Sequence, residues 1–274
     1  MLKKEQAYAK TTFDEVATKY DEIPFFKISA RHVVDLIKER KKEENLNILD
    51  VACGTGNVVL ECASCMVSTL FDAVDISEGM LAKAKENAFE QKIENINFKL
   101  QDVTKLSLEK KYDVVTCAYA LFFLPEAHEV LKQLMLLLKE DGMVIFTSFK
   151  ANTFNPSSEI LLALLEKHGS PSAKEYERDK WENLRKVEDI ERLCGIAGIG
   201  SVEIETKVIR YGMSVDEWWE LFNNTGFKGM LMELSSEAYA LLKQEFYEAM
   251  FEELDSDAEV ELVADSYFVL LQAI

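Results

Sequence analysis

Between residues 47 and 150, short apolar runs alternate with longer amphipathic segments. The apolar runs have the length of buried strands, and the amphipathic segments have the length of helices with several turns. Strands that alternate with helices predict a parallel sheet with helices on both faces, because parallel strands need a long crossover connection. The expected strands are 47–51, 69–75, 96–102, 112–121 and 143–150, and the expected helices are 57–66, 77–91 and 125–140.

The pattern changes after residue 150. A helix-rich stretch at 156–197 precedes an expected strand at 202–209, and a last strand is expected at 266–274. Between these strands, Ser214 and Glu217 have the spacing of a capping box, which predicts a helix start, and another helix is expected at 236–254. We therefore expect four parts. They are an N-terminal helical lid segment (1–44), an α/β core (45–211), a helical lid insertion (212–256) and a last strand that completes the sheet (257–274).

Charge and composition limit the classes of partner. Lys and Arg number 31 against 49 Asp and Glu, which gives a net charge of −18. A surface with this much negative charge repels phosphate backbones and anionic lipid head groups. We therefore expect a small-molecule acceptor and no nucleic acid. No segment reaches the roughly 20 apolar residues of a membrane span, so no membrane insertion is expected. The polar first ten residues and five scattered cysteines favour a cytoplasmic location. The sequence gives no prediction for the oligomeric state.

The segment from Leu49 to Gly56, Leu-Asp-Val-Ala-Cys-Gly-Thr-Gly, joins the first expected strand to the first expected helix. Gly54 and Gly56 have no Cβ atom, so the loop can turn tightly and its backbone can approach a ligand closely. The N–H groups at the start of the following helix favour a carboxylate or a phosphate there. The segment therefore predicts a cofactor-binding loop.

Two kinds of cofactor compete for this loop. A dinucleotide fingerprint has the form G-x-G-x-x-G and needs its third glycine for close packing of helix against strand. Asn57, Val58 and Val59 follow Gly56, so the third glycine is missing. The carboxylate of Asp50 would also lie beside a bound pyrophosphate, whereas it would attract a cofactor that carries an ammonium group. These residues favour a cofactor that carries an ammonium group over a dinucleotide.

The Leu49–Gly56 segment resembles motif I of class I S-adenosylmethionine-dependent methyltransferases. Its form is typical of the menaquinone/ubiquinone-biosynthesis C-methyltransferase-like ("type 11") group. The resemblance covers residues 13–149, roughly half of the chain. It implies a Rossmann-like, doubly wound sheet of seven mostly parallel strands with a helical lid. It also implies S-adenosylmethionine as cofactor, S-adenosylhomocysteine as product, and no metal.

The resemblance assigns roles to residues at the strand ends. Asp75, 19 residues beyond Gly56, corresponds to the acidic residue that binds both ribose hydroxyls. Ile76 would pack on the adenine, with Met80 a further candidate, and Asp102 would close the third strand and accept from the adenine amine. The expected cofactor-binding residues are Tyr20, Asp50, Ala52, Cys53, Gly54, Gly56, Asp75, Ile76, Met80, Gln101, Asp102, Val103 and Cys117.

Other segments point to the acceptor side. Residues 112–119 resemble motif IV, whose strand end lies between cofactor and acceptor, and Tyr119 is the one catalytic candidate. Residues 13–21 resemble a segment that folds over the cofactor, with Tyr20 as the expected contact. Trp218 and Trp219 point about 100° apart on a helix, so we expect one in the lid core and one at the substrate. The expected substrate-pocket residues are Tyr119, Phe122, Trp218 and Trp219.

These features predict a methyltransferase that acts on a small hydrophobic or aromatic molecule. The methyl group would pass to O, N or C by in-line displacement, which mainly requires alignment and exclusion of water. Two alternatives are transfer of another group from a sulfonium cofactor and a non-catalytic S-adenosylmethionine-binding module. The intact set of Asp50, Gly54, Gly56 and Asp75 favours an active enzyme over the second alternative.

Overall fold

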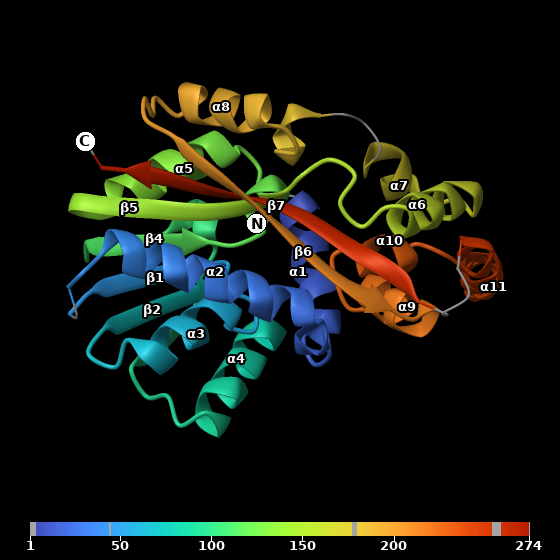
Figure 1. Cartoon of the computed structure of the whole chain (residues 1–274), viewed down its shortest axis with the longest axis horizontal. Coiled ribbons are helices and arrows are strands. Elements are labelled where there is room, and N and C mark those ends of the chain that lie inside the picture. Colours follow the sequence, from blue (N-terminus) through green and yellow to red (C-terminus); the bar gives the residue numbers. More distant parts are fainter. Residues whose placement is uncertain (1–3, 44, 177–179, 254–258, 274) are drawn as a thin grey trace.

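The computed structural model describes residues 4–43, 45–176, 180–253 and 259–273. Its strands form one seven-stranded sheet in the order β3-β2-β1-β4-β5-β7-β6 (Figure 1). Strands β1 to β5 pair in parallel, and β7 runs antiparallel to both β5 and β6. The predicted mostly parallel, seven-stranded α/β fold is confirmed. The strands are β1 (Asn47–Val51), β2 (Leu70–Asp75), β3 (Ile96–Leu100), β4 (Tyr112–Cys117), β5 (Leu138–Phe149), β6 (Glu203–Met213) and β7 (Val260–Gln272).

Helices cover both faces of the sheet because its central strands are apolar on both sides. On one face, α2 (Pro24–Arg40), α3 (Asn57–Cys65) and α4 (Glu78–Glu90) pack against residues such as Ile48 of β1. On the other face, α5 (Ala127–Leu136) and α8 (Val187–Ile196) pack against residues such as Leu49. Neighbouring residues of β1 thus belong to opposite cores, as the alternation along a strand requires.

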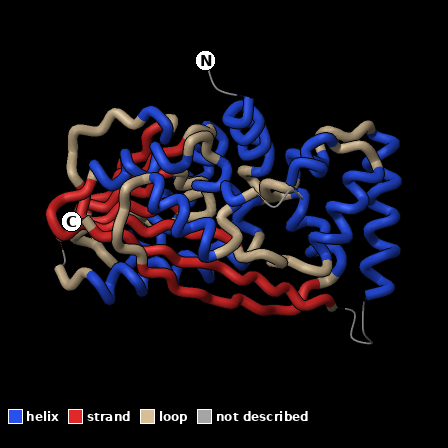
Figure 2. The backbone as a smooth tube through the Cα atoms, turned by 90° about the horizontal axis from the view of Figure 1, so that it is seen from above, coloured by secondary structure: helices blue, strands red, loops and turns tan. Residues whose placement is uncertain are grey.

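A separate helical layer lies beyond one end of the sheet. It contains α6 (Ser157–Lys167), α7 (Pro171–Tyr176), α9 (Val215–Asn223), α10 (Lys228–Leu231) and α11 (Ser236–Glu253), which share one apolar core. The long β6–β7 pair extends past the other strands to reach this layer (Figures 1 and 2). Helices α9 to α11 connect these two strands, so they form an insertion between β6 and β7.

The four-part division remains a prediction, but the packing refines it. Helices α6 and α7 belong to the expected core range, yet they pack with α9 to α11 in the helical layer. Helix α2 lies in the expected N-terminal lid segment, yet its buried face packs on the sheet with α3. Residues of α1 (Lys4–Val16) line the first of the two cavities described below, and Phe26, Ser29 and Ala30 of α2 line the second.

Several predicted element ends were wrong. The helix expected to end at residue 140 ends at Leu136, because β5 already begins at Leu138. The last strand begins at Val260 rather than at residue 266, because its residues 260–270 pair with β6. Leu254 and Ile274, the expected ends of a helix and of the last strand, lie outside the described residues. Among the described helices, none is both long and apolar enough to cross a membrane.

Candidate active site

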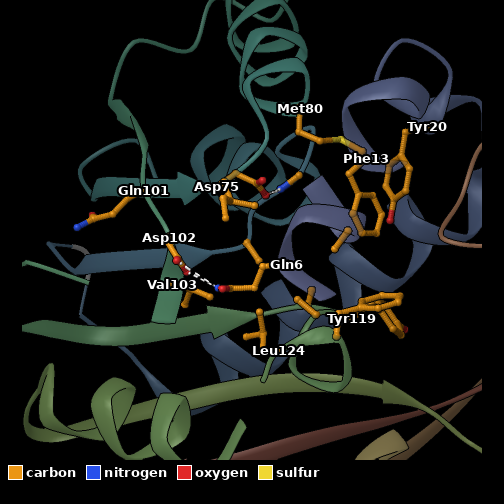
Figure 3. Close-up of a pocket in the computed structure, with 17 residues that line it drawn as sticks. Gln6, Phe13, Tyr20, Asp75, Met80, Gln101, Asp102, Val103, Tyr119 and Leu124 are labelled. Carbon is orange, nitrogen blue, oxygen red and sulfur yellow. Dashed lines mark hydrogen bonds between the residues drawn. The ribbon is translucent and has the colours of Figure 1, made fainter. Parts of the chain in front are cut away.

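Two cavities adjoin at the carboxyl ends of the parallel strands. The first encloses about 780 Å³, including the space open to solvent, and the second about 430 Å³. Both are lined by Tyr20, Ala52, Gly54, Ala118 and Tyr119, so they share a wall. Figure 3 shows the first cavity. The first is also lined by Gln6, Ala9, Phe13, Asp75, Ile76, Met80, Gln101, Asp102, Val103, Ala120, Phe123 and Leu124. The second is also lined by Phe26, Ser29, Ala30, Asp50, Cys53, Asn57 and Val58.

The carboxylate of Asp75 is held by two backbone N–H groups. Gly54 donates to Oδ2 at 2.8 Å, and Ser77 donates to Oδ1 at 2.8 Å. The side chain is 8% exposed and borders the first cavity. Burial raises the pKa of Asp75, while the N–H groups of Ser77 and Gly54 act in the opposite direction. Each oxygen keeps a lone pair for a further donor, so the geometry suits a vicinal diol.

The two loop glycines have different surroundings. Both have a left-handed backbone, with φ of +57° at Gly54 and +89° at Gly56. A Cβ atom on Gly54 would meet nothing within 4 Å, and this residue lines both cavities. A Cβ atom on Gly56 would lie 3.0 Å from a methyl carbon of Leu60, and Gly56 lines neither cavity. The missing Cβ atom of Gly56 thus permits close packing against Leu60 of α3, and its role beside a ligand stays a prediction.

This difference separates two alanine variants. Gly54→Ala and Gly56→Ala both place a side chain at positive φ, which costs about 1 kcal/mol. Gly56→Ala adds the clash with Leu60, so we expect it to lower the free energy of unfolding by about 1–3 kcal/mol more. Gly54→Ala should instead mainly weaken cofactor binding. Urea unfolding and ligand titration of both variants test this, and equal losses of stability would contradict it.

Asp102 follows β3 and caps the short 3₁₀ helix η2 (Val103–Lys105), where it accepts from the Thr104 N–H at 2.9 Å. The predicted strand end at Asp102 was wrong, because β3 ends at Leu100. The Asp102 carboxylate also accepts from the Gln6 amide of α1, at 3.1 and 3.2 Å (Figure 3). A purine amine at this place would share Asp102 with the Gln6 amide or replace it.

Asp50 lies at the second cavity and is 2% exposed. Its Oδ1 accepts from the Thr116 hydroxyl at 2.6 Å, and its Oδ2 is buried without a hydrogen-bond partner among the described residues. Burial raises the pKa of Asp50 to about 7, against the effect of the Thr116 hydroxyl and the Val59 N–H. A buried acceptor without a partner is costly, so this oxygen suits a ligand that brings a cationic donor.

Aromatic rings form the wall where the two cavities meet. Tyr119 has a φ of +51°, its ring stacks on Phe149 at 4.5 Å, and its hydroxyl donates to Ser266 at 3.0 Å and contacts Ser29 at 2.7 Å. Burial raises the pKa of Tyr119 to about 12, so the hydroxyl stays protonated near neutral pH. The hydrogen bonds to Ser29 and Ser266 hold the ring of Tyr119 in this position. Its catalytic role stays a prediction.

Four further predicted site residues line neither cavity. Cys117 is fully buried in the core between the sheet and α5. Phe122 packs inward, and its neighbour Phe123 lines the first cavity instead. Trp218 and Trp219 are both buried in the helical layer, so the prediction that one of them faces the substrate is not supported. Trp218 packs on Phe154 and Phe222, and Trp219 packs on Tyr239, Phe246 and Tyr247.

Sequence reasoning also missed residues that line the cavities. Gln6 and Ser29 come from the N-terminal helices, where ordinary helix patterns gave no signal of a site. Asn57 was named only as one of the residues that follow Gly56, although a polar residue directly after the loop itself indicates a binding site. Phe13 lies in the segment that resembles one folded over the cofactor, so the resemblance indicated the segment but not this residue.

Residues 42–218 match the family model described as a methyltransferase domain, which covers more than half of the chain. The chain belongs to this family. As the motif resemblance predicted, it is a class I S-adenosylmethionine-dependent methyltransferase. The finer "type 11" assignment remains a prediction.

Named relatives of this methyltransferase share about 30% of its residues. The malonyl-[acyl-carrier protein] O-methyltransferase of Halalkalibacterium halodurans is 28% identical over 271 residues, 95% of this chain and 96% of that enzyme. The enzyme of the same name from Bacillus cereus is 31% identical over 144 residues, and the match spans 52% of each chain. The aklanonic acid methyltransferase DauC of a Streptomyces species is 29% identical over 202 residues, 68% of this chain and 90% of that enzyme.

Solved methyltransferase structures share the fold. The plantazolicin methyltransferase BpumL in complex with S-adenosylhomocysteine has a TM-score of 0.55 and 17% identity, over 98% of this chain and 95% of that one. The magnesium protoporphyrin IX methyltransferase of Synechocystis, also with bound S-adenosylhomocysteine, has a TM-score of 0.52 and 18% identity. It covers 89% of this chain and 82% of that one.

Proposed function

We propose that the two adjoining cavities together bind S-adenosylmethionine. Asp75 would accept from both ribose hydroxyls, and Asp102 would accept from the adenine amine. Ile76, Met80 and Val103 supply apolar walls for the purine. The observation that carries this proposal is the pair of N–H groups that hold Asp75 beside the glycine loop.

The second cavity fits the methionine part of the cofactor. Asp50 borders this cavity, and its buried Oδ2, which has no hydrogen-bond partner in the described part of the chain, would accept from an ammonium group. The start of α3, with Asn57 as its first residue, provides N–H groups for a carboxylate. Charged groups at both ends of the amino-acid part would thus find opposite partners. This agreement with donor and acceptor chemistry supports the methionine site independently of Asp75.

The acceptor would lie against the aromatic wall of the first cavity. S-adenosylmethionine supplies a methyl group already activated on a sulfonium. Phe13, Tyr20, Tyr119 and Phe123 can align an apolar acceptor with this group and keep water away. We infer a small acceptor with a hydrophobic or aromatic body. Among the relatives, the named substrate of DauC, aklanonic acid, is a free small molecule. The aromatic wall favours this kind of acceptor over an acyl group on a carrier protein.

Calorimetric titration of the purified protein with S-adenosylmethionine, S-adenosylhomocysteine and NAD tests the cofactor assignment. We expect micromolar binding of the two adenosyl ligands, equivalent to about −8 kcal/mol, and no binding of NAD. A panel of phenols and apolar acids, assayed for release of S-adenosylhomocysteine, then tests the acceptor class. Binding of NAD in preference to the adenosyl ligands would overturn the proposed site.

A further inference from the structure

The N-terminal segment from Gln6 to Glu22, called the strap below, borders the first cavity. It comprises most of α1 and the short 3₁₀ helix η1 (Tyr20–Glu22). Two of its side chains, Phe13 and Tyr20, lie side by side and border the cavity (Figure 3). Their rings meet edge to face at 6.4 Å, and Phe13 also meets Phe123 at 5.7 Å. The strap therefore supplies part of the wall around the reacting groups.

One carboxylate fastens the strap near the start of α4. The Ser77 hydroxyl donates to Asp14 at 2.5 Å, and the Gly79 N–H donates to the same oxygen at 3.1 Å. Gly79 packs against the strap backbone, because a Cβ atom there would lie 3.1 Å from the carbonyl oxygen of Asp14. The N–H of Ser77 holds Asp75, so a single residue contacts both the strap and the proposed ribose carboxylate.

A second carboxylate, Asp21, fastens the far end of the strap. Its Oδ1 accepts from the Thr55 hydroxyl and from the Asn57 amide, the latter at 3.1 Å. Its Oδ2 accepts from the Asn87 amide of α4 at 2.6 Å, and the same amide donates to the Thr55 carbonyl at 3.1 Å. Asp21 thus joins three segments that are distant in sequence: the strap, the cofactor loop and the last turn of α4.

Asp21 directly follows Tyr20, so its three hydrogen bonds fix the backbone that carries this ring. Tyr20 stacks on Phe26 at 4.4 Å and lines both cavities. The ring therefore borders the junction between the parts of the site assigned to the adenosyl and methionyl groups. An aromatic ring beside a sulfonium attracts its positive charge, and this attraction depends on ring position.

We propose that Asp21 is a positioning residue for methyl transfer, which holds Tyr20 against the reacting end of the cofactor by binding the cofactor loop and α4. This inference rests on the proposed cofactor site. In this role, Asp21 links the position of the cofactor loop to the position of the Tyr20 ring. It also explains why a carboxylate is needed, since one group must accept three hydrogen bonds from two directions.

Two variants test the role. Asp21→Asn places an amide N–H₂ against donors from Thr55, Asn57 or Asn87, and Asn87 cannot turn its amide without losing the Thr55 carbonyl. Asn87→Ala removes one anchor from a helix surface and leaves both cavities unchanged. Glu22→Gln, an exposed neighbour with the same loss of charge, is the matched control.

We expect both variants to release S-adenosylhomocysteine at least tenfold faster than the wild type in stopped-flow experiments. We also expect S-adenosylmethionine to lose more affinity than S-adenosylhomocysteine, because only the former has the positive charge that Tyr20 would sense. Glu22→Gln should match the wild type in both measurements. A lower melting temperature with unchanged release rate and unchanged preference would reduce Asp21 to a structural role and overturn the inference. If the wild type bound neither ligand, the proposed cofactor site itself would fail.

Discussion

Replacing Asp75 by alanine is expected to weaken S-adenosylmethionine binding by at least a hundredfold. Two ribose hydroxyls would lose a charged acceptor, and each such hydrogen bond contributes about 1.5–3 kcal/mol. The sum, about 3–6 kcal/mol, corresponds to a hundredfold to ten-thousandfold loss of affinity. The N–H groups of Gly54 and Ser77 would lose their acceptor as well, which loosens the loop that borders both cavities. Calorimetric titration with S-adenosylmethionine measures the effect.

A neighbouring carboxylate provides the control for this variant. Glu78 is exposed at the first turn of α4, so Glu78→Gln removes the same charge near the site. We expect this control to bind S-adenosylmethionine as the wild type does. Circular dichroism of the Asp75→Ala protein establishes that it remains folded. Wild-type affinity in folded Asp75→Ala protein would show that the ribose lies elsewhere.

The strand ends could be predicted from the sequence because parallel topology fixes their place. Parallel strands have their carboxyl ends at one edge of the sheet, and β1 and β2 end at Val51 and Asp75 as predicted. The loop that follows β1 therefore meets the end of β2, where the Gly54 N–H donates to Asp75 at 2.8 Å. The loop glycines show the limit of this reasoning. Both have positive φ, but only the surrounding packing shows that a side chain at Gly56 would meet Leu60, whereas one at Gly54 would meet nothing.

Residues far from the motif could not be placed in the same way. The contact between Gln6 and Asp102 spans 96 positions, and nothing local in α1 indicates it. Trp218 and Trp219 lie on an amphipathic helix, and its sequence pattern is as compatible with a pocket wall as with a lid core. Their burial depends on α11, which lies later in the same insertion, and on α6, which comes from another part of the chain. Tertiary packing decides whether such a residue lines a pocket or the core, and the local sequence pattern does not contain this information.

Asp50→Asn is expected to change stability and cofactor affinity in opposite directions. An aspartate in an unfolded chain titrates at about 3.9, whereas burial raises the pKa of Asp50 to about 7. Between these values the folded state holds a proton that the unfolded state has released. The free energy of unfolding therefore falls as the pH rises from about 4 to about 7, and the loss is complete above 7.

The size of this effect follows from the linkage. Three pH units at about 1.4 kcal/mol each set an upper bound of about 4 kcal/mol. An asparagine avoids the buried charge, but its amide N–H₂ must be buried where Oδ2 has no partner, which costs about 1–3 kcal/mol. We therefore expect Asp50→Asn to unfold at higher urea concentration than the wild type at pH 8, with a gain of about 1–3 kcal/mol, and to show no gain at pH 4.

The same carboxylate should control the pH dependence of cofactor binding. An ammonium group favours the ionised form of Asp50, whose pKa is about 7. An α-amino group titrates at about 7.7–8.0, so its own loss of protons reduces the gain, and the affinity of the wild type for S-adenosylmethionine should rise about sixfold between pH 6.0 and pH 7.5. The Asp50→Asn protein should bind more weakly and lose this rise. 5′-Methylthioadenosine lacks the amino-acid part, so its affinity should be the same in both proteins at both pH values. A pH-dependent affinity for 5′-methylthioadenosine, or an undiminished rise with S-adenosylmethionine in Asp50→Asn, would show that the ammonium group does not bind in this cavity.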